Sequence, residues 1–160
     1  MSEWRLTEVV AKWLEAQEWE ERPETKEERM TSSTEFSYQL NDDFTAKCFL
    51  EVVEKAGFFK VYMYYFDTKI PVPKINEVVT FANLANAKIP VGELIVHPED
   101  NMRVIKFYLG MDFEDAAFEP QHISNMLSSG LRTLKERLPQ MMAICFGGKS
   151  AEEAVDMEID

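Results

Sequence analysis

The segment from Phe58 to Gly92 constrains the fold of this chain more than any other, because it joins a strand pattern to a helix pattern through two prolines. Its first nine residues, FFKVYMYYF, alternate between two apolar sets that would face opposite sides of a sheet. One set is Phe59, Val61, Met63 and Tyr65, and the other is Phe58, Tyr62, Tyr64 and Phe66, with Lys60 as the only charge. A strand with two apolar faces either lies between two packed layers or carries a contact surface for another chain.

The prolines at positions 71 and 73 end this strand. Each removes a backbone N–H donor and pushes the residue before it toward extended geometry. From Lys74 the apolar spacing becomes helical, until Pro90 and Gly92 end the helix. The apolar stripe of this central helix consists of Ile75, Val78, Val79, Ala82, Ala85 and Ile89.

The remaining elements follow from the same two periodicities. We expect a helix at residues 3–19, strands at 36–40 and 44–53, a hairpin of strands at 93–97 and 102–109, and a long helix from Pro120 to Gly147. Within the long helix the apolar stripe continues past Pro139, and Gly130 marks a site of close packing. The order helix, three strands, helix, two strands, helix predicts an α+β fold with an antiparallel sheet of about five strands.

The length of 160 residues predicts one domain, which we place at residues 1–148. Residues 20–34 (EERPETKEERMTSST) are charged and lack periodicity, so we interpret them as a solvated connector. Residues 149–160 form an acidic tail that we expect to be disordered.

The net charge of −12 is concentrated at the two ends of the chain. Residues 1–35 carry −5 and residues 149–160 carry −4, which leaves −3 for residues 36–148. Binding to nucleic acid or to anionic membranes needs clustered lysine and arginine, and the chain has no such cluster. We therefore expect neither nucleic acid nor a membrane as a partner.

The two cysteines, Cys48 and Cys145, lie in apolar-patterned segments, which favours buried, reduced thiols. No apolar run approaches the ~20 residues that cross a bilayer, and the first residues, MSEWRLTEVV, lack the basic and apolar regions of a signal peptide. These features predict a cytoplasmic protein.

Several short motifs, in this element order, resemble the YbjN family of small bacterial proteins. They are IPVP at 70–73 before the central helix, Asn86 near its end, IPVG at 89–92 and Leu138 with Pro139 in the last helix. The likeness covers roughly residues 4–148. It implies a fold similar to that of class I type III secretion chaperones, which are acidic homodimers that hold segments of other proteins. It also implies a role in sensory transduction or stress regulation, and it brings no catalytic residues and no cofactor.

The residues that could carry chemistry have simpler explanations. His97 and His122 lack metal-ligand neighbours at a suitable spacing, and we interpret both as structural or surface residues. The acidic residues at 112–115 (Asp112, Glu114, Asp115) could bind a divalent ion, but acids before a helix commonly favour its N-terminus. Ser128, Ser129 and Gly130 lie within a helix rather than at a nucleophile elbow. The sequence therefore predicts no enzyme, metal site or cofactor.

The candidate binding surface is the second apolar face of the sheet, formed by Phe49, Val53, Tyr62, Tyr64 and Phe66. Either a helix covers this face, or it binds a second copy or a partner segment. The favoured hypothesis is a non-catalytic, homodimeric protein-binding module that acts as a chaperone or regulatory adaptor. The alternative is a small-molecule or divalent-metal sensor, or a weak hydrolase, that uses the acidic loop 112–115.

Overall fold

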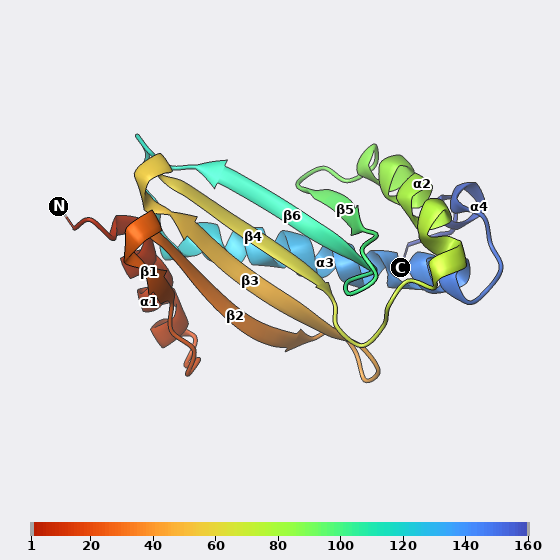
Figure 1. Cartoon of the computed structure of the whole chain (residues 1–160), viewed down its shortest axis with the longest axis horizontal. Helices are drawn as coiled ribbons and strands as arrows, with labels where there is room; N and C mark the ends of the chain where they lie inside the picture. Colours follow the sequence, from red (N-terminus) through yellow and green to blue (C-terminus); the bar gives the residue numbers. More distant parts are fainter. Residues whose placement is uncertain (1, 160) are drawn as a thin grey trace.

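The computed structural model describes residues 2–159 and contains one antiparallel sheet with its α-helices on one face (Figure 1). The strands are β1 (Glu24–Lys26), β2 (Thr31–Gln39), β3 (Thr45–Val53), β4 (Phe58–Tyr65), β5 (Glu93–His97) and β6 (Val104–Asp112). They lie in the order β1-β2-β3-β4-β6-β5, so β6 returns from the edge strand to pair with β4. The α+β prediction is confirmed, with six strands rather than about five.

Four α-helices accompany the sheet within the described residues. They are α1 (Arg5–Ala16), α2 (Ile75–Asn86), α3 (Pro120–Cys145) and α4 (Ala151–Val155). Helix α3 runs behind the sheet along its length, while α2 and α4 lie together at the end opposite to the N-terminus (Figure 1). Short 3₁₀ turns at Glu27–Arg29, Glu54–Ala56 and Val72–Lys74 join neighbouring elements.

The core lies between the sheet and helices α1 and α3. The alternation predicted for β3 and β4 is confirmed, since Ala46, Cys48, Leu50, Phe59, Val61 and Met63 are all buried. The absence of a side chain at Gly130 lets α3 approach the sheet closely. A Cβ atom there would lie 2.6 Å from Met63 Cε and 2.7 Å from Phe107 Cδ1, which confirms the close packing expected at this glycine.

Helix α2 begins after the two prolines and ends at Asn86. The predicted stripe was wrong at Val79, which is 46% exposed, and it omitted Phe81, which is fully buried. Because three and four residues alternate along one helix face, Val78, Phe81, Ala82 and Ala85 form the stripe that is buried. The side chain of Asn86 bonds both backbone groups of Leu94 in β5, donating to its oxygen at 3.0 Å and accepting from its nitrogen at 2.7 Å. It therefore holds the start of the edge strand against α2.

Residues 20–34, predicted to be a solvated connector, are mostly exposed up to residue 30 but form regular structure. This range contains β1, a 3₁₀ turn and the start of β2. The inward positions of β2 here are taken by Ser32 and Thr34, both buried, and Ser32 Oγ lies 2.8 Å from Thr7 Oγ1 in α1. A hydrophobic pattern could not show this strand because its buried face is partly polar, with the Thr7–Ser32 hydroxyl pair in place of an apolar contact.

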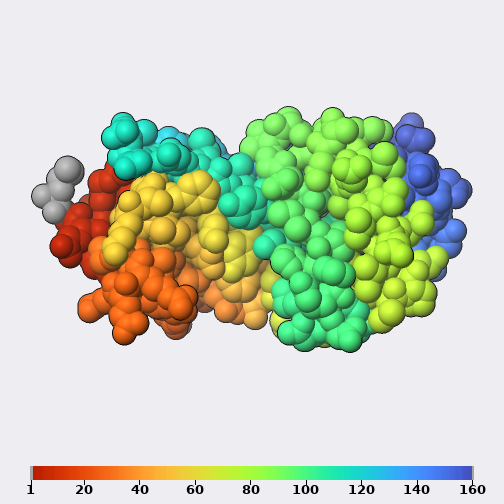
Figure 2. All heavy atoms as spheres, turned by 45° about the horizontal axis from the view of Figure 1, so that its top comes forward, coloured from red at the N-terminus to blue at the C-terminus, as the bar shows by residue number. Residues whose placement is uncertain are grey.

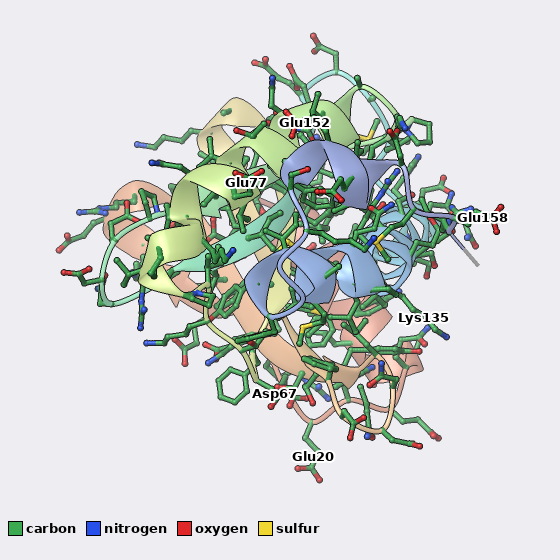
Figure 3. The ribbon with its side chains drawn as sticks, turned by 90° about the vertical axis from the view of Figure 1, so that its right-hand side faces the viewer. Glu20, Asp67, Glu77, Lys135, Glu152 and Glu158 are labelled. Carbon is green, nitrogen blue, oxygen red and sulfur yellow. The ribbon has the colours of Figure 1, made fainter. Side chains whose placement is uncertain are left out.

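The prediction of a disordered tail at 149–160 was also wrong, because α4 packs against α2 and α3 (Figure 3). Ala151 and Ala154 are fully buried. The Ser150 hydroxyl and the Glu153 carboxylate form a reciprocal capping box at the start of α4. Glu77 of α2 also accepts a hydrogen bond from the Ala151 backbone nitrogen at 2.6 Å. The acidic composition hid a capping box and a short apolar face.

Candidate functional site

The candidate site is the outer face of the sheet, which is the face away from α1 and α3. The register places Phe49, Tyr62 and Tyr108 side by side across β3, β4 and β6. The next row toward one end consists of Lys47, Tyr64 and Lys106, and the next row toward the other end contains Glu51 and Lys60. Aromatic side chains thus occupy the middle of this face and charged side chains border them.

No α-helix of residues 2–159 lies over this face, which is turned toward the viewer in Figure 1. Figure 2 shows β3 and β4, in yellow and orange, reaching the surface between the N-terminal elements and the β5–β6 hairpin. The outward side chains of these strands are half-buried, whereas their inward neighbours are buried. Of the two possibilities that the sequence left open, the described residues therefore show an uncovered face.

Four aromatic residues make up what we call the aromatic strip: Phe49, Tyr62, Tyr64 and Tyr108. The rings of Phe49 and Tyr62 stack with centroids 4.6 Å apart and planes 11° apart. The ring of Tyr64 also stacks with Phe49, and their centroids are 6.0 Å apart. Such stacking restrains the rings of Phe49, Tyr62 and Tyr64, so this part of the strip is ordered before anything binds to it.

Glu51 connects the strip to its charged border. One carboxylate oxygen accepts a hydrogen bond from the Tyr62 hydroxyl at 2.8 Å, and the other lies 2.8 Å from the ammonium of Lys60. Burial, and then the carboxylate of Glu51, raise the pKa of the Tyr62 phenol above its ordinary value. The neighbouring Lys47 pairs with Glu35 of β2. The tyrosine hydroxyl is therefore fixed as a hydrogen-bond donor within the protein.

Lys106 differs from the other two lysines of this face. Its ammonium lies 4.8 Å from the centroid of the Tyr62 ring, which is a cation–π contact. None of the ion pairs formed within residues 2–159 includes it. Burial, and then the positive charge of Lys60, lower the pKa of Lys106 below its ordinary value.

Three of the five residues predicted for the surface lie together, namely Phe49, Tyr62 and Tyr64. Phe66 follows the end of β4, is 57% exposed and lies under the Lys47 ammonium at 5.3 Å. Val53 pairs with Phe58 at the far end of β3, away from the strip. The sequence analysis missed Tyr108 and Lys106, although β6 shows the alternation that could have identified them.

The other candidate residues have structural roles. The Nδ1 atom of His122 accepts the Glu119 backbone N–H at 2.9 Å and so completes the capping box of α3. In the acidic loop, the Asp112 carboxylate accepts the Glu114 backbone N–H at 2.8 Å. His97 lies 3.7 Å from Glu99 in the β5–β6 hairpin. Across residues 2–159, no three histidine, cysteine or acidic side chains gather where they could hold a metal ion.

The sequence predicted that both cysteines are buried, and the structure confirms this for Cys48 but not fully for Cys145. Cys48 is fully buried, and burial raises the pKa of its thiol to about 12. Cys145 near the end of α3 is only half-buried. Among the helices of the described chain, none has the length and hydropathy that a membrane span requires.

The chain matches no known family model, and no curated protein sequence matches it significantly. A likeness exists at the level of structure. A chain in the crystal structure of the ExsC–ExsE complex superposes with a TM-score of 0.53 at 8% sequence identity, over 79% of this chain and 86% of that chain. At this identity the match shows that the two chains share a fold.

Proposed function

We propose that this chain is a non-catalytic protein-binding module of the bacterial cytoplasm, which acts as a chaperone-like or regulatory adaptor in stress or sensory regulation. We also assign it to the YbjN family on the motifs of its central helix and flanking strands. The observation that carries the proposal is the uncovered aromatic strip on the outer face of the sheet. The fold supports it, because the similar chain belongs to a structure of two proteins in complex.

The strip has the physical features of a binding surface for an apolar segment. Half-buried aromatic rings offer a large apolar area and bind without much loss of side-chain entropy when they are already ordered. The stacking of Phe49, Tyr62 and Tyr64 and the bond from Tyr62 to Glu51 provide that order. Tyrosines also tolerate contact with water when the partner leaves.

The size of the strip favours a segment of a partner rather than a whole protein face. No helix of the described residues covers the four aromatic side chains, but adjacent side chains of the sheet bury much of their area. Their exposed surface is therefore roughly 300 Å² at most. A stable interface between folded proteins buries about 800 Å² on each partner. A short extended or helical segment matches the smaller area.

The proposal includes a homodimer, for which the strip alone is too small. Two exposed valines lie in and just before α2, Val79 in the helix and Val72 in the 3₁₀ turn before it, and they are 46% and 57% exposed. Glu77 is the only charged residue of α2, while the adjacent α4 adds Glu152 and Glu153. Light scattering over a range of concentrations tests the homodimer, and Val79→Asp is expected to shift a dimer toward the monomer. A wild-type mass equal to one chain at every concentration would remove the dimer from the proposal.

Binding to the strip is tested with peptides selected from a random display library on the wild-type protein. The double variant Tyr62→Asp, Tyr64→Asp should lose at least about tenfold in affinity for these peptides, because it removes two central aromatic contacts. Tyr38→Asp is the matched control, since Tyr38 is exposed on the same sheet but lies in the row of the inward-facing Ala46 and Tyr65.

Circular dichroism and thermal unfolding must show that the variants remain folded. If the double variant unfolds, the single Tyr64→Asp change repeats the test away from Glu51. Equal binding by folded wild-type and variant proteins would contradict the proposed surface.

A further inference from the structure

Within the described part of the chain, Lys106 is an unpaired cation at the border of the aromatic strip, on a face whose other two lysines are paired. The outer face carries three lysines on β3, β4 and β6, and two of them have carboxylate partners, Lys47 with Glu35 and Lys60 with Glu51. Lys106 has only the face of the Tyr62 ring, at 4.8 Å. Its ammonium is nevertheless partly removed from water, which destabilises the charged form.

Within residues 2–159 no carboxylate forms an ion pair with Lys106, although Glu93 lies one row away on β5, opposite Tyr108. Tyr64 lies opposite it on β4 and Ile95 lies opposite it on β5. Glu51 is the acid whose charge acts to raise the pKa of Lys106, and it is already held by Lys60 and the Tyr62 hydroxyl. Lys60 adds a second positive charge to the same region. An incoming anion would therefore meet one ammonium that has no carboxylate partner among the described residues, within a chain whose net charge is −12.

We propose that the partner segment carries a carboxylate, from Asp or Glu, that pairs with Lys106 while apolar side chains of the same segment lie on the aromatic strip. This inference rests on the proposed function and specifies the chemistry of the segment that binds there. Charge complementarity supports this proposal. A half-buried ammonium is stabilised most by a carboxylate whose binding also excludes water from it.

The aromatic strip makes a peptide the fitting source of this carboxylate. Lys106 and Tyr108 are two residues apart and lie on the same face of β6. Tyr62 of β4 contacts the first through its ring and is paired with the second. A segment that places a carboxylate on Lys106 would bring its neighbouring side chains over Tyr62 and Tyr64. The ion pair would set the register of the segment, and the rings would supply most of the buried apolar area.

The experiment compares peptide selection on the wild type, on Lys106→Met and on Lys47→Met. Lys47 is the matched control, since it lies in the same row but is already paired with Glu35. Peptides selected on the wild type should be enriched in Asp or Glu at one position between apolar residues. Replacing that acid by its amide should weaken binding about tenfold, and Lys106→Met should do the same, with no further loss when both changes are combined. Lys47→Met should change the affinity by less than about threefold.

The possible failures are distinguishable. Peptides that need Tyr62 and Tyr64 but show no enrichment in acids, or bind Lys106→Met equally well, would overturn the carboxylate and leave the strip as a binding surface. If no selected peptide depended on Tyr62 and Tyr64, both proposals would fail. If Lys106→Met instead abolished self-association of the wild type, a second copy would supply the carboxylate, and the partner segment would be the wrong occupant.

Discussion

Asn86 gives the sharpest quantitative test of the structure. Its side-chain amide makes two hydrogen bonds to the backbone of Leu94, at 3.0 and 2.7 Å, and Leu94 is only 3% exposed. The change Asn86→Ala removes both partners at once. Each bond contributes about 1 kcal/mol net, and a buried backbone group left unpaired costs about 1–3 kcal/mol.

The expected loss of unfolding free energy is about 1.5–4 kcal/mol. Leaving the Leu94 N–H and C=O unpaired costs about 2–4 kcal/mol in total. The upper part of the range for two fully buried groups does not apply, because Asn86 is half-buried and water can partly replace its side chain. Alanine returns up to about 0.6 kcal/mol through its higher helix propensity. Urea unfolding measures the difference, provided that the dependence on urea concentration is the same in both proteins.

Asn76→Ala is the matched control, because Asn76 is an exposed asparagine of the same helix. We expect it to change stability by no more than about 0.5 kcal/mol. Asn86→Asp should lie between the two, since it keeps the acceptor for the Leu94 N–H but loses the donor to the Leu94 oxygen. If Asn86→Ala were as stable as Asn76→Ala, the attachment of β5 to α2 described above would be wrong.

Three further predictions concern packing and thiol chemistry. Gly130→Ala should lower stability by about 1–2 kcal/mol, because the added methyl group would lie 2.7 Å from Phe107 and this strain exceeds the gain in helix propensity; a more stable variant in urea would contradict the close approach. Ending the chain after Lys149 removes α4 and should lower stability by at least about 1 kcal/mol while increasing the binding of an apolar dye; unchanged unfolding would mean that α4 does not pack as described. At pH 8 the Cys48 thiol should resist Ellman's reagent until the protein unfolds, because its raised pKa of about 12 keeps it protonated and burial blocks access; rapid labelling of both cysteines in the native protein would refute this.

Local patterns predicted the elements and their faces where the buried side chains are apolar. The alternation of β3 and β4 assigned Cys48, Phe59 and Val61 to the core and Tyr62 to the other side, and all four lie there. The pattern failed where polar groups are buried, as at Ser32 in β2. It also failed in the acidic C-terminal segment, because the high net charge indicated disorder while the capping box and the short apolar face of α4 went unrecognised.

The composition of the candidate surface could be predicted only in part, because the surface depends on pairing between distant strands. Phe49 and Tyr62 belong to neighbouring strands joined by a tight turn, so their proximity follows from local order. Tyr108 and Lys106 join them only because β6 pairs with β4 across more than forty residues of chain. Nothing in the local sequence specifies that register, which sets both the width of the strip and the position of its unpaired cation.

The central claim is that a partner segment binds the aromatic strip. It is tested most directly by fluorine NMR of the protein labelled with 3-fluorotyrosine, during titration with a peptide selected on the wild type. The chain has five tyrosines, whose resonances are assigned by single Tyr→Phe changes. We expect the resonances of Tyr62, Tyr64 and Tyr108 to shift on binding, and those of Tyr38 and the buried Tyr65 to stay unchanged. Shifts confined to Tyr38 or Tyr65, or binding without any change at the three tyrosines of the strip, would contradict it.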